Sequence, residues 1–292
     1  MSVEPQKIAI IGLGLLGGSL GLALKEKGYH RLGWARRPET RTLALELDAI
    51  DETSDELDII LSQADLTVLC LPIPQIIKFC EQHAKVFKKG SVVTDIGSVK
   101  ETIVTSAEAS FDGIDVEFIG SHPMAGTEKN GLEFSFATLY DKAAIFVTPT
   151  ATSTYQAVQK VNALWKAIET NPIEISIQEH DNLVAHTSHI SHVLALALSL
   201  TVLDCDDEVK QHRYDGCASG FRDTSRITSS NPKMWREIIE NNQPAVLDVV
   251  KSVEDEWHEI RTVIENKDFD KLEKLFSKGK RLRDAWMDYR YN

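Results

Sequence analysis

Apolar residues in the first half of the chain fall into short runs that alternate with stretches of helical spacing. The runs are the predicted strands, at residues 7–11, 31–35, 66–71, 91–95, 117–120 and 144–147. The predicted helices between them lie at residues 19–27, 38–47 and 76–87. Near-continuous apolar strands separated by helices are typical of a parallel sheet that is covered on both faces. We therefore expect an α/β fold with a mostly parallel, doubly wound sheet.

The second half of the chain changes to helical spacing. Its predicted elements are a helix at 155–169, a short strand at 173–177, and helices at 181–203, 244–265 and 269–289. The helix at 181–203 is apolar throughout residues 193–198, so we expect it to be buried on most sides. We place the domain boundary near residue 170, with an α/β domain at 1–170 and an all-helical C-terminal domain at 171–292.

Composition and charge narrow the class of protein. Of 292 residues, 32 are Lys or Arg and 44 are Asp or Glu, which gives a formal net charge of −12 and disfavours nucleic-acid binding. No uninterrupted apolar run reaches the ~20 residues of a membrane-spanning helix, and the N-terminus lacks a secretory pattern. We expect a cytoplasmic protein with no membrane contact. Its cysteines form no Cys-x-x-Cys pair, which argues for reduced thiols rather than disulfides or a zinc site.

A glycine-rich turn directly follows the first predicted strand and opens a helix, with the pattern G-x-G-x-x-G. Gly12 permits the tight turn, Gly14 lets a pyrophosphate approach the backbone, and Gly17 allows close packing of helix on strand. The helix N-terminus then presents free N–H groups to the phosphates. We expect a Rossmann-type dinucleotide site, against the alternative of a packing turn without a ligand. The candidate cofactor contacts are Gly12, Leu13, Gly14, Leu15, Leu16 and Gly17.

Residues at the end of the second strand contact the 2′ group of the cofactor's ribose. In NAD enzymes this strand end carries an acidic residue. This chain has Ala35, Arg36 and Arg37 there, and guanidinium groups pair well with phosphate. NADP is therefore favoured as the cofactor. NAD stays possible if the Glu39 side chain extends to the ribose hydroxyls and the two arginines are only surface charges. Further cofactor contacts are expected at the carboxyl ends of later strands, from Leu71, Pro72 and Ser98.

Residues 95–100 and 120–128 also follow predicted strands, at the edge where ligands of such sheets bind. His122 precedes Pro123, which favours an extended backbone, and it could accept a proton near neutral pH. The alternatives are that His122 is a hydrogen-bonded loop histidine and that Ser98 caps a helix starting near Val99.

Two further clusters lie in the helical half. Arg222 and Arg226 share a face if their segment is helical, which would suit an anionic substrate, unless they pair internally with Asp223 or Asp215. Histidines 180, 186, 189 and 192 suggest zinc, but no carboxylate or cysteine completes a set at a usual spacing, so we predict no metal.

Taken together, five motifs resemble the prephenate/arogenate dehydrogenase family of tyrosine biosynthesis. They occur in that family's order and cover both predicted domains. The motifs are GLGLLGGSL (12–20), TDIGSVK (94–100), GSHPMAGTE (120–128), HD…SHISH (180–192) and SGFRDTSRI (219–227).

The resemblance implies oxidative decarboxylation of prephenate or arogenate, with hydride transfer to NAD(P)+, giving 4-hydroxyphenylpyruvate or tyrosine. It implies that His122 accepts the proton of the ring hydroxyl, that Ser98 orients His122 and the hydroxyl, and that Arg226 binds a substrate carboxylate. It places Trp235 in a matching segment. Further residues that it places near the substrate are Arg222, Thr127, Glu128, His180, Asp181, His189 and His192.

The resemblance also implies a C-terminal dimerisation domain and hence a homodimer. Longer members carry a mutase segment or a regulatory domain that we do not find here, so we expect any inhibition by the product tyrosine to act in the active cleft. Two alternatives are kept. One is another two-domain NADP-dependent enzyme of the β-hydroxyacid dehydrogenase type, whose helix lysine motif we do not find, and the other is a dimer that senses NADP without turnover.

Overall fold

The computed structural model describes residues 5–127 and 129–291. The chain divides into two compact units, Met1–Gln243 and Pro244–Asn292, and each is described by itself. The first unit holds the sheet and several helices after it, and the second unit is a pair of long helices.

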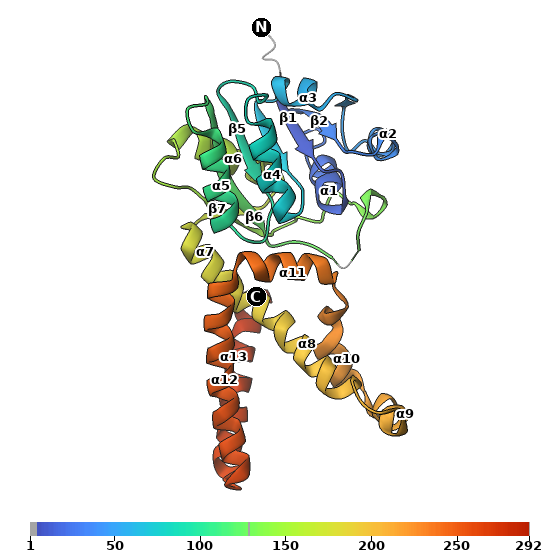
Figure 1. Ribbon diagram of the computed structural model, residues 1–292, viewed down its shortest axis with the longest axis vertical. Coiled ribbons are helices and arrows are strands. Elements are labelled where there is room, and N and C mark those ends of the chain that lie inside the picture. Colours follow the sequence, from blue (N-terminus) through green and yellow to red (C-terminus); the bar gives the residue numbers. More distant parts are fainter. Residues whose placement is uncertain (1–4, 128, 292) are drawn as a thin grey trace. The chain divides into compact units, whose positions relative to one another are not determined.

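Within the described residues, the sheet of the first unit has eight strands in the order β3-β2-β1-β4-β5-β6-β7-β8 (Figure 1). All neighbouring strands are parallel except β6 and β7, which are antiparallel. The strand order reverses between β1 and β4, which is where ligands bind in doubly wound sheets. The strands are β1 (Gln6–Ile11), β2 (Tyr29–Trp34), β3 (Glu52–Thr53), β4 (Leu66–Leu69), β5 (Ser91–Asp95), β6 (Val116–Pro123), β7 (Ala144–Thr148) and β8 (Asn171–Glu174).

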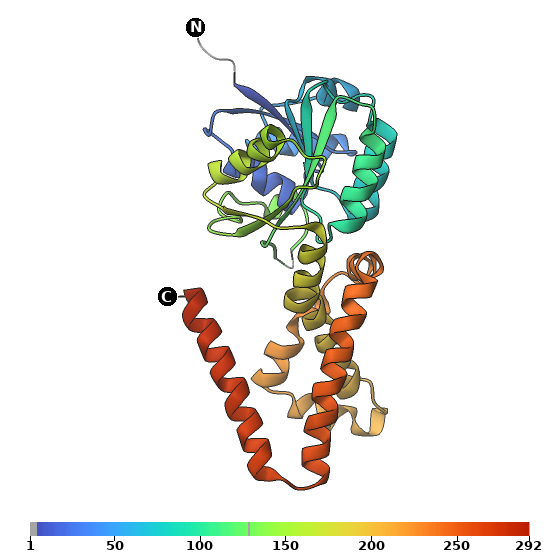
Figure 2. The same ribbon diagram turned by 90° about the vertical axis from the view of Figure 1, so that its left-hand side faces the viewer.

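Helices cover both faces of this sheet (Figure 2). Ile8 and Ile10 of β1 belong to one apolar core, and Ala9 and Ile11 belong to the other, because successive side chains of a strand point to opposite faces. The first core is closed by α1 (Leu15–Ala23), α2 (Pro38–Glu46) and α6 (Tyr155–Ala167), and the second by α3 (Leu57–Gln63), α4 (Ile73–His83) and α5 (Glu101–Phe111). The predicted doubly wound fold is confirmed.

Strand β6 differs from its prediction in a way that matters for function. It runs on to Pro123, because residues 120–123 pair with β7 in the register His122↔Phe146. His122 therefore lies in a strand, not in a loop. Strand β8 begins at Asn171, so the sheet extends slightly beyond the predicted boundary at residue 170.

After the sheet, the first unit continues as helices. They are α7 (Ile177–Val184), a π-helical turn (Ala185–His189), α8 (Ile190–Leu203), α9 (Asp207–Gly216), α10 (Ser219–Ser225), a 3-10 turn (Arg226–Ser229) and α11 (Pro232–Asn241). The expectation that the apolar helix is buried on most sides is wrong for this single chain. Only Ile190 and Ala195 of α8 are buried, whereas Leu196 and Leu200 are about half exposed, at 48% and 54%.

The continuous helix Ile177–Leu203 has 27 residues and a mean hydropathy of 1.4 in its most apolar window, 28% of which is buried. By length and composition alone it could cross a membrane, although polar residues interrupt its apolar sequence. One such helix is weak evidence, because core helices of soluble proteins pass the same test.

The second unit is a helical hairpin of α12 (Gln243–Glu265) and α13 (Phe269–Tyr291). Lys271 bridges to Glu259 across the hairpin at 2.9 Å. Large apolar side chains are exposed on both helices, including Trp257, Ile264, Phe269, Phe276 and Leu282.

Candidate active site

The glycine-rich turn between β1 and α1 has the geometry of a dinucleotide site. Gly12 has φ +101°, and a Cβ there would lie 2.2 Å from the carbonyl oxygen of Cys70. A Cβ at Gly17 would lie 2.1 Å from the carbonyl oxygen of Gly12, whereas a Cβ at Gly14 would have nothing within 4 Å. No side chain caps the N-terminus of α1, so its N–H groups stay available to a phosphate. The turn therefore fits a pyrophosphate at Gly14.

At the end of β2, Ala35 is buried and Arg36 and Arg37 are exposed. Neither arginine has an ion-pair partner among the residues that the structure describes. The neighbouring Arg41 is instead buried, and it donates to the carbonyl oxygen of Ala35 at 2.7 Å and pairs with Asp55. The two exposed guanidinium groups are thus free to meet a phosphate.

A cavity of about 260 Å³ opens in the first unit, near the carboxyl ends of β5 and β6. It brings together two predicted site residues on the sheet side, Ser98 and His122, with His189 from the π-helical turn. Its remaining wall is largely apolar. The other lining residues are Pro123, Met124, Ala125, Gly126, Ser188, Met234, Trp235 and Ile238.

His122 is the end of a chain of hydrogen bonds. Its Nδ1 lies 2.9 Å from Nε2 of His180, and Nδ1 of His180 lies 2.7 Å from a carboxylate oxygen of Asp181. That carboxylate also accepts the backbone N–H groups of Lys100 at 2.7 Å and Glu101 at 2.9 Å. Asp181 therefore caps α5 from a distant part of the chain, and Ser98 does not take that role.

A buried ion pair holds the loop that carries Ser98. The Lys100 ammonium is fully buried, pairs with Asp95 and donates to the carbonyl oxygen of Ser121 at 2.8 Å. Asp95 also accepts the backbone N–H of Gly97 at 2.7 Å. Asp95 and Lys100, at the two ends of this loop, thus pair with each other, and Lys100 connects them to Ser121 of β6, the residue before His122.

Burial keeps the histidines around the cavity neutral. It holds the pKa of His122 well below the usual range, and the nearby positive charge of Lys100 acts in the same direction. Burial also lowers the pKa of His180, despite its bond to Asp181, and lowers that of His189 to about 4. A neutral His122 can accept a proton at physiological pH, as a general base must.

The far wall of the cavity is a stacked pair of side chains. The rings of His192 and Trp235 lie 3.6 Å apart, and Trp235 lines the cavity. Asn242 donates through Nδ2 to the backbone oxygen of Asp181 at 2.8 Å and to Nδ1 of His189 at 3.2 Å. Asn242 therefore links His189, which lines the cavity, to the backbone of Asp181.

Other predicted residues lie outside this cavity. Arg222 is exposed and pairs with Asp223 at 2.9 Å, as the internal ion-pair alternative held. Arg226 is exposed and does not line the cavity. Burial lowers the pKa of His192, which stacks on Trp235, and the charge of Arg226 adds a smaller effect in the same direction. Thr127 is exposed, and Glu128 lies outside the described residues.

Among the residues that hold the site in place, Asp95, Lys100 and Asn242 had no predicted role, and neither had the lining residues Ser188, Met234 and Ile238. A lysine a few residues after a strand-ending aspartate, in an apolar segment, was an available signal for the first two. Nothing near Asn242 in the sequence pointed to the site. No group of three His, Cys, Asp or Glu residues that could hold a metal ion occurs in the described part of the chain.

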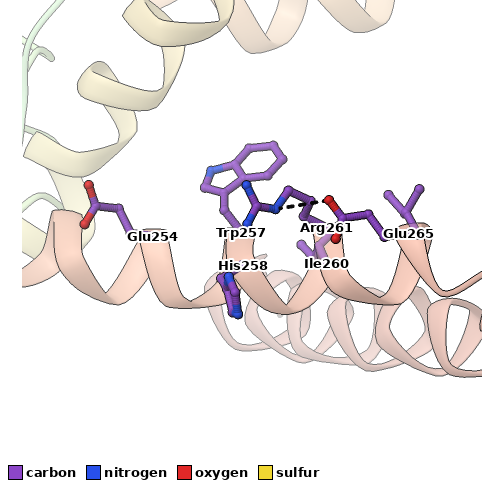
Figure 3. A pocket seen from close by; sticks show the side chains of 7 residues that line it. Glu254, Trp257, His258, Ile260, Arg261 and Glu265 are labelled. Carbon is purple, nitrogen blue, oxygen red and sulfur yellow. Dashed lines mark ion pairs between the residues drawn. The ribbon is translucent and has the colours of Figure 1, made fainter.

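A larger cavity of about 560 Å³ lies in the second unit and is lined by α12 alone. Figure 3 shows Trp257 there beside Arg261, which pairs with Glu265 at 3.6 Å. It is an open face of one helix, and no nucleotide-binding turn belongs to it.

Comparisons with known proteins agree with this geometry. Residues 20–174 match the family model for the prephenate dehydrogenase nucleotide-binding domain, and residues 176–278 match that for the prephenate dehydrogenase dimerization domain. The chain is 32% identical to a prephenate dehydrogenase of Bacillus subtilis, with 98% of this chain and 77% of that protein covered. It is 31% identical to a cyclohexadienyl dehydrogenase of Zymomonas mobilis, with 95% of each chain covered.

A solved structure is also similar along nearly the whole chain. It is the prephenate dehydrogenase from A. aeolicus in complex with hydroxyphenyl propionate and NAD+. The TM-score is 0.89 at 28% identity, and the alignment covers 98% of this chain and 99% of that one. The chain therefore belongs to the prephenate dehydrogenase family and is an NAD(P)-dependent dehydrogenase.

Proposed function

We propose that this enzyme oxidatively decarboxylates prephenate or arogenate in the cavity lined by Ser98 and His122. The observation that carries the proposal is a neutral histidine in a small, mostly apolar cavity at the carboxyl edge of a dinucleotide-binding sheet. An apolar wall of Met234, Trp235 and Ile238 suits a six-membered carbon ring.

The protein's main tasks in this reaction are to position the substrate against the cofactor and to remove the hydroxyl proton. The nicotinamide, when bound, accepts the hydride from the ring carbon that bears the hydroxyl. His122 takes the hydroxyl proton as the C–O bond becomes a carbonyl. The ring carboxylate then leaves as CO2, the electrons of the broken C–C bond pass through the ring to the carbonyl oxygen, and the aromatic phenolate takes a proton back from the His122 imidazolium to give the phenol. Ser98, which lines the same cavity, orients the hydroxyl toward His122.

A spectrophotometric assay of NADPH or NADH formation tests this function with prephenate and arogenate in separate reactions. Turnover of either substrate supports it. Turnover of a β-hydroxyacid alone, or dinucleotide binding without turnover of any of these substrates, would establish one of the two alternative functions instead. The same assay determines whether the side chain that the enzyme prefers carries a keto or an amino group.

We further propose that NADP is the preferred cofactor, bound through Arg36 and Arg37. Their exposure and lack of ion-pair partners within the described residues support this. Replacing both by alanine should raise KM for NADP+ by about 10- to 100-fold, which corresponds to a lost charge-assisted contact of ~1.5–3 kcal/mol, and should leave KM for NAD+ nearly unchanged. An equal loss with both cofactors would show that the arginines do not read the 2′-phosphate.

Because tyrosine is the product formed from arogenate, we propose that it binds in the same cavity. It should compete with the cyclohexadienyl substrate in steady-state kinetics. Inhibition that excess substrate does not relieve would place tyrosine elsewhere.

A further inference from the structure

The hydrogen bonds behind His122 determine which of its two nitrogens carries a proton. A neutral imidazole has one N–H donor and one acceptor nitrogen, and the partner of one nitrogen decides the state of the other. Hydrogen-bond partners that can only donate or only accept determine which nitrogen carries that proton.

The constraint starts at Asp181. Its carboxylate accepts two backbone N–H groups, from Lys100 and Glu101, and those groups can only donate. Its Oδ1 also faces Nδ1 of His180 at 2.7 Å, so that nitrogen must be the one that carries hydrogen. Because His180 is buried and its pKa is lowered, it is neutral, and its Nε2 is left as an acceptor.

The same logic passes to His122. An acceptor at Nε2 of His180, 2.9 Å from Nδ1 of His122, requires hydrogen on that Nδ1. Nε2 of His122 then carries only a lone pair. Since Nδ1 is occupied by His180, Nε2 is the nitrogen left for a ligand in the cavity.

We propose that Asp181 and His180 are positioning residues that hold neutral His122 in its Nδ1–H tautomer, so that Nε2 is the base. The catalytic part of this proposal rests on the proposed function. The substrate hydroxyl proton moves to Nε2, the resulting imidazolium donates through Nδ1 to Nε2 of His180, and no second proton transfer, from His122 to His180, is needed.

Titratable groups around His122 come from several elements. His180 faces it from α7, Lys100 from the segment before α5, and His189 from the π-helical turn. The charge of Lys100 is matched by Asp95, with which it pairs. The Asp181 carboxylate is therefore the charged group that acts on His122 through the hydrogen bonds of His180.

Nitrogen-15 NMR of protein labelled in its histidines tests the tautomer without any turnover. The His122 resonances, assigned by their loss in His122→Asn, should show a protonated Nδ1 and a bare Nε2 in the resting enzyme. A protonated Nε2 on His122 overturns the proposal. If Nε2 is unprotonated but the protein oxidises neither prephenate nor arogenate, the tautomer proposal is supported and the proposed function is refuted.

Two substitutions of His180 test how the tautomer of His122 affects catalysis. His180→Leu removes the acceptor, and we expect kcat to fall by about 100-fold or more, since a wrong tautomer in the Ser-His-Asp triad costs about 10⁴. The acid limb of the kcat/KM profile should also move to lower pH, because the imidazolium loses its acceptor. His180→Gln places a carbonyl oxygen near the former Nε2, and it should restore most of kcat and the wild-type profile.

His186→Leu is the matched control, since His186 is exposed in the π-helical turn that follows α7 and bonds through Nδ1 to the backbone oxygen of Asn182. It should leave both kcat and the pH profile unchanged. Equal losses in His180→Leu and His180→Gln, with the profile unmoved in both, would mean that His180 only fills space. If His180→Leu does not fold, the NMR measurement and His180→Gln still decide.

Discussion

His122 is the residue on which the proposed chemistry depends most. His122→Asn keeps the size and polarity of the side chain but removes the base, so kcat should fall by about 10²–10⁴-fold. Dinucleotide affinity should not change, because His122 lies on β6 and not at the glycine-rich turn. His212→Asn, on the exposed surface of α9, is the control. Near-native kcat in His122→Asn would remove His122 from the reaction.

The pH dependence of the reaction follows from the same side chain. A base is active when it is unprotonated, so the rate should be lost as pH falls through its pKa in the free enzyme. Burial lowers that pKa well below the usual range, so kcat/KM should stay level through pH 6.5 and fall only in more acidic solution. A fall that begins above pH 7 would contradict a buried, neutral His122.

Arg226 is the residue whose role the single chain supports least directly. It is exposed beside His192 and outside the cavity wall, so it reaches a substrate carboxylate only if the ligand or a second chain extends toward it. If it does bind that carboxylate, Arg226→Ala should raise KM by about 10- to 100-fold with little change in kcat. Arg236→Ala on α11, whose guanidinium pairs with Glu240, should leave KM unchanged. An unaltered KM in Arg226→Ala would exclude the contact.

At the scale of single elements, two glycines of the turn between β1 and α1 have different roles, one in binding the dinucleotide and one in folding. Gly14→Ala meets open space, so it should fold normally and raise KM for the dinucleotide by crowding the pyrophosphate. Gly17→Ala meets the carbonyl oxygen of Gly12 at 2.1 Å, so it should lower the free energy of unfolding, by roughly 1–3 kcal/mol. Urea unfolding and dinucleotide titration distinguish the two, and equal stability of both variants would contradict this division.

The sequence predicted seven of the eight described strands because strand and helix periodicities are local, and it missed β3, whose two residues are too few to show a period. It did not predict that β6 runs through His122, because that extension depends on pairing with β7. It also missed that Asp181 caps α5, because the two lie 80 residues apart in the chain. Lys100 would ordinarily be placed at the surface, and only its pairing with Asp95 makes burial tolerable. The residues that touch a ligand followed from local motifs, whereas those that hold them in place required the fold.

At the scale of the whole molecule, several large apolar side chains are exposed on two helices, and exposed apolar faces often mark interaction surfaces. Leu196 and Leu200 of α8 are about half exposed, and Phe276 and Leu282 of α13 are exposed by 74% and 63%. These residues, except Leu282, lie in the segment that matches the family's dimerization domain. We therefore expect a homodimer that buries these faces.

Substitution on α13 tests the dimer and its membrane alternative together. In a two-fold interface each substitution counts twice, and burying one Phe is worth ~1.5–3 kcal/mol, so Phe276→Glu should weaken the dimer by at least about 100-fold. Sedimentation velocity should then show monomers at concentrations where the wild type is dimeric, and where Lys274→Glu on the same helix still is. If the wild-type chain instead sediments as a monomer, or binds lipid vesicles through α8, the exposed faces serve another purpose, and Arg226 would have to reach the cavity within its own chain.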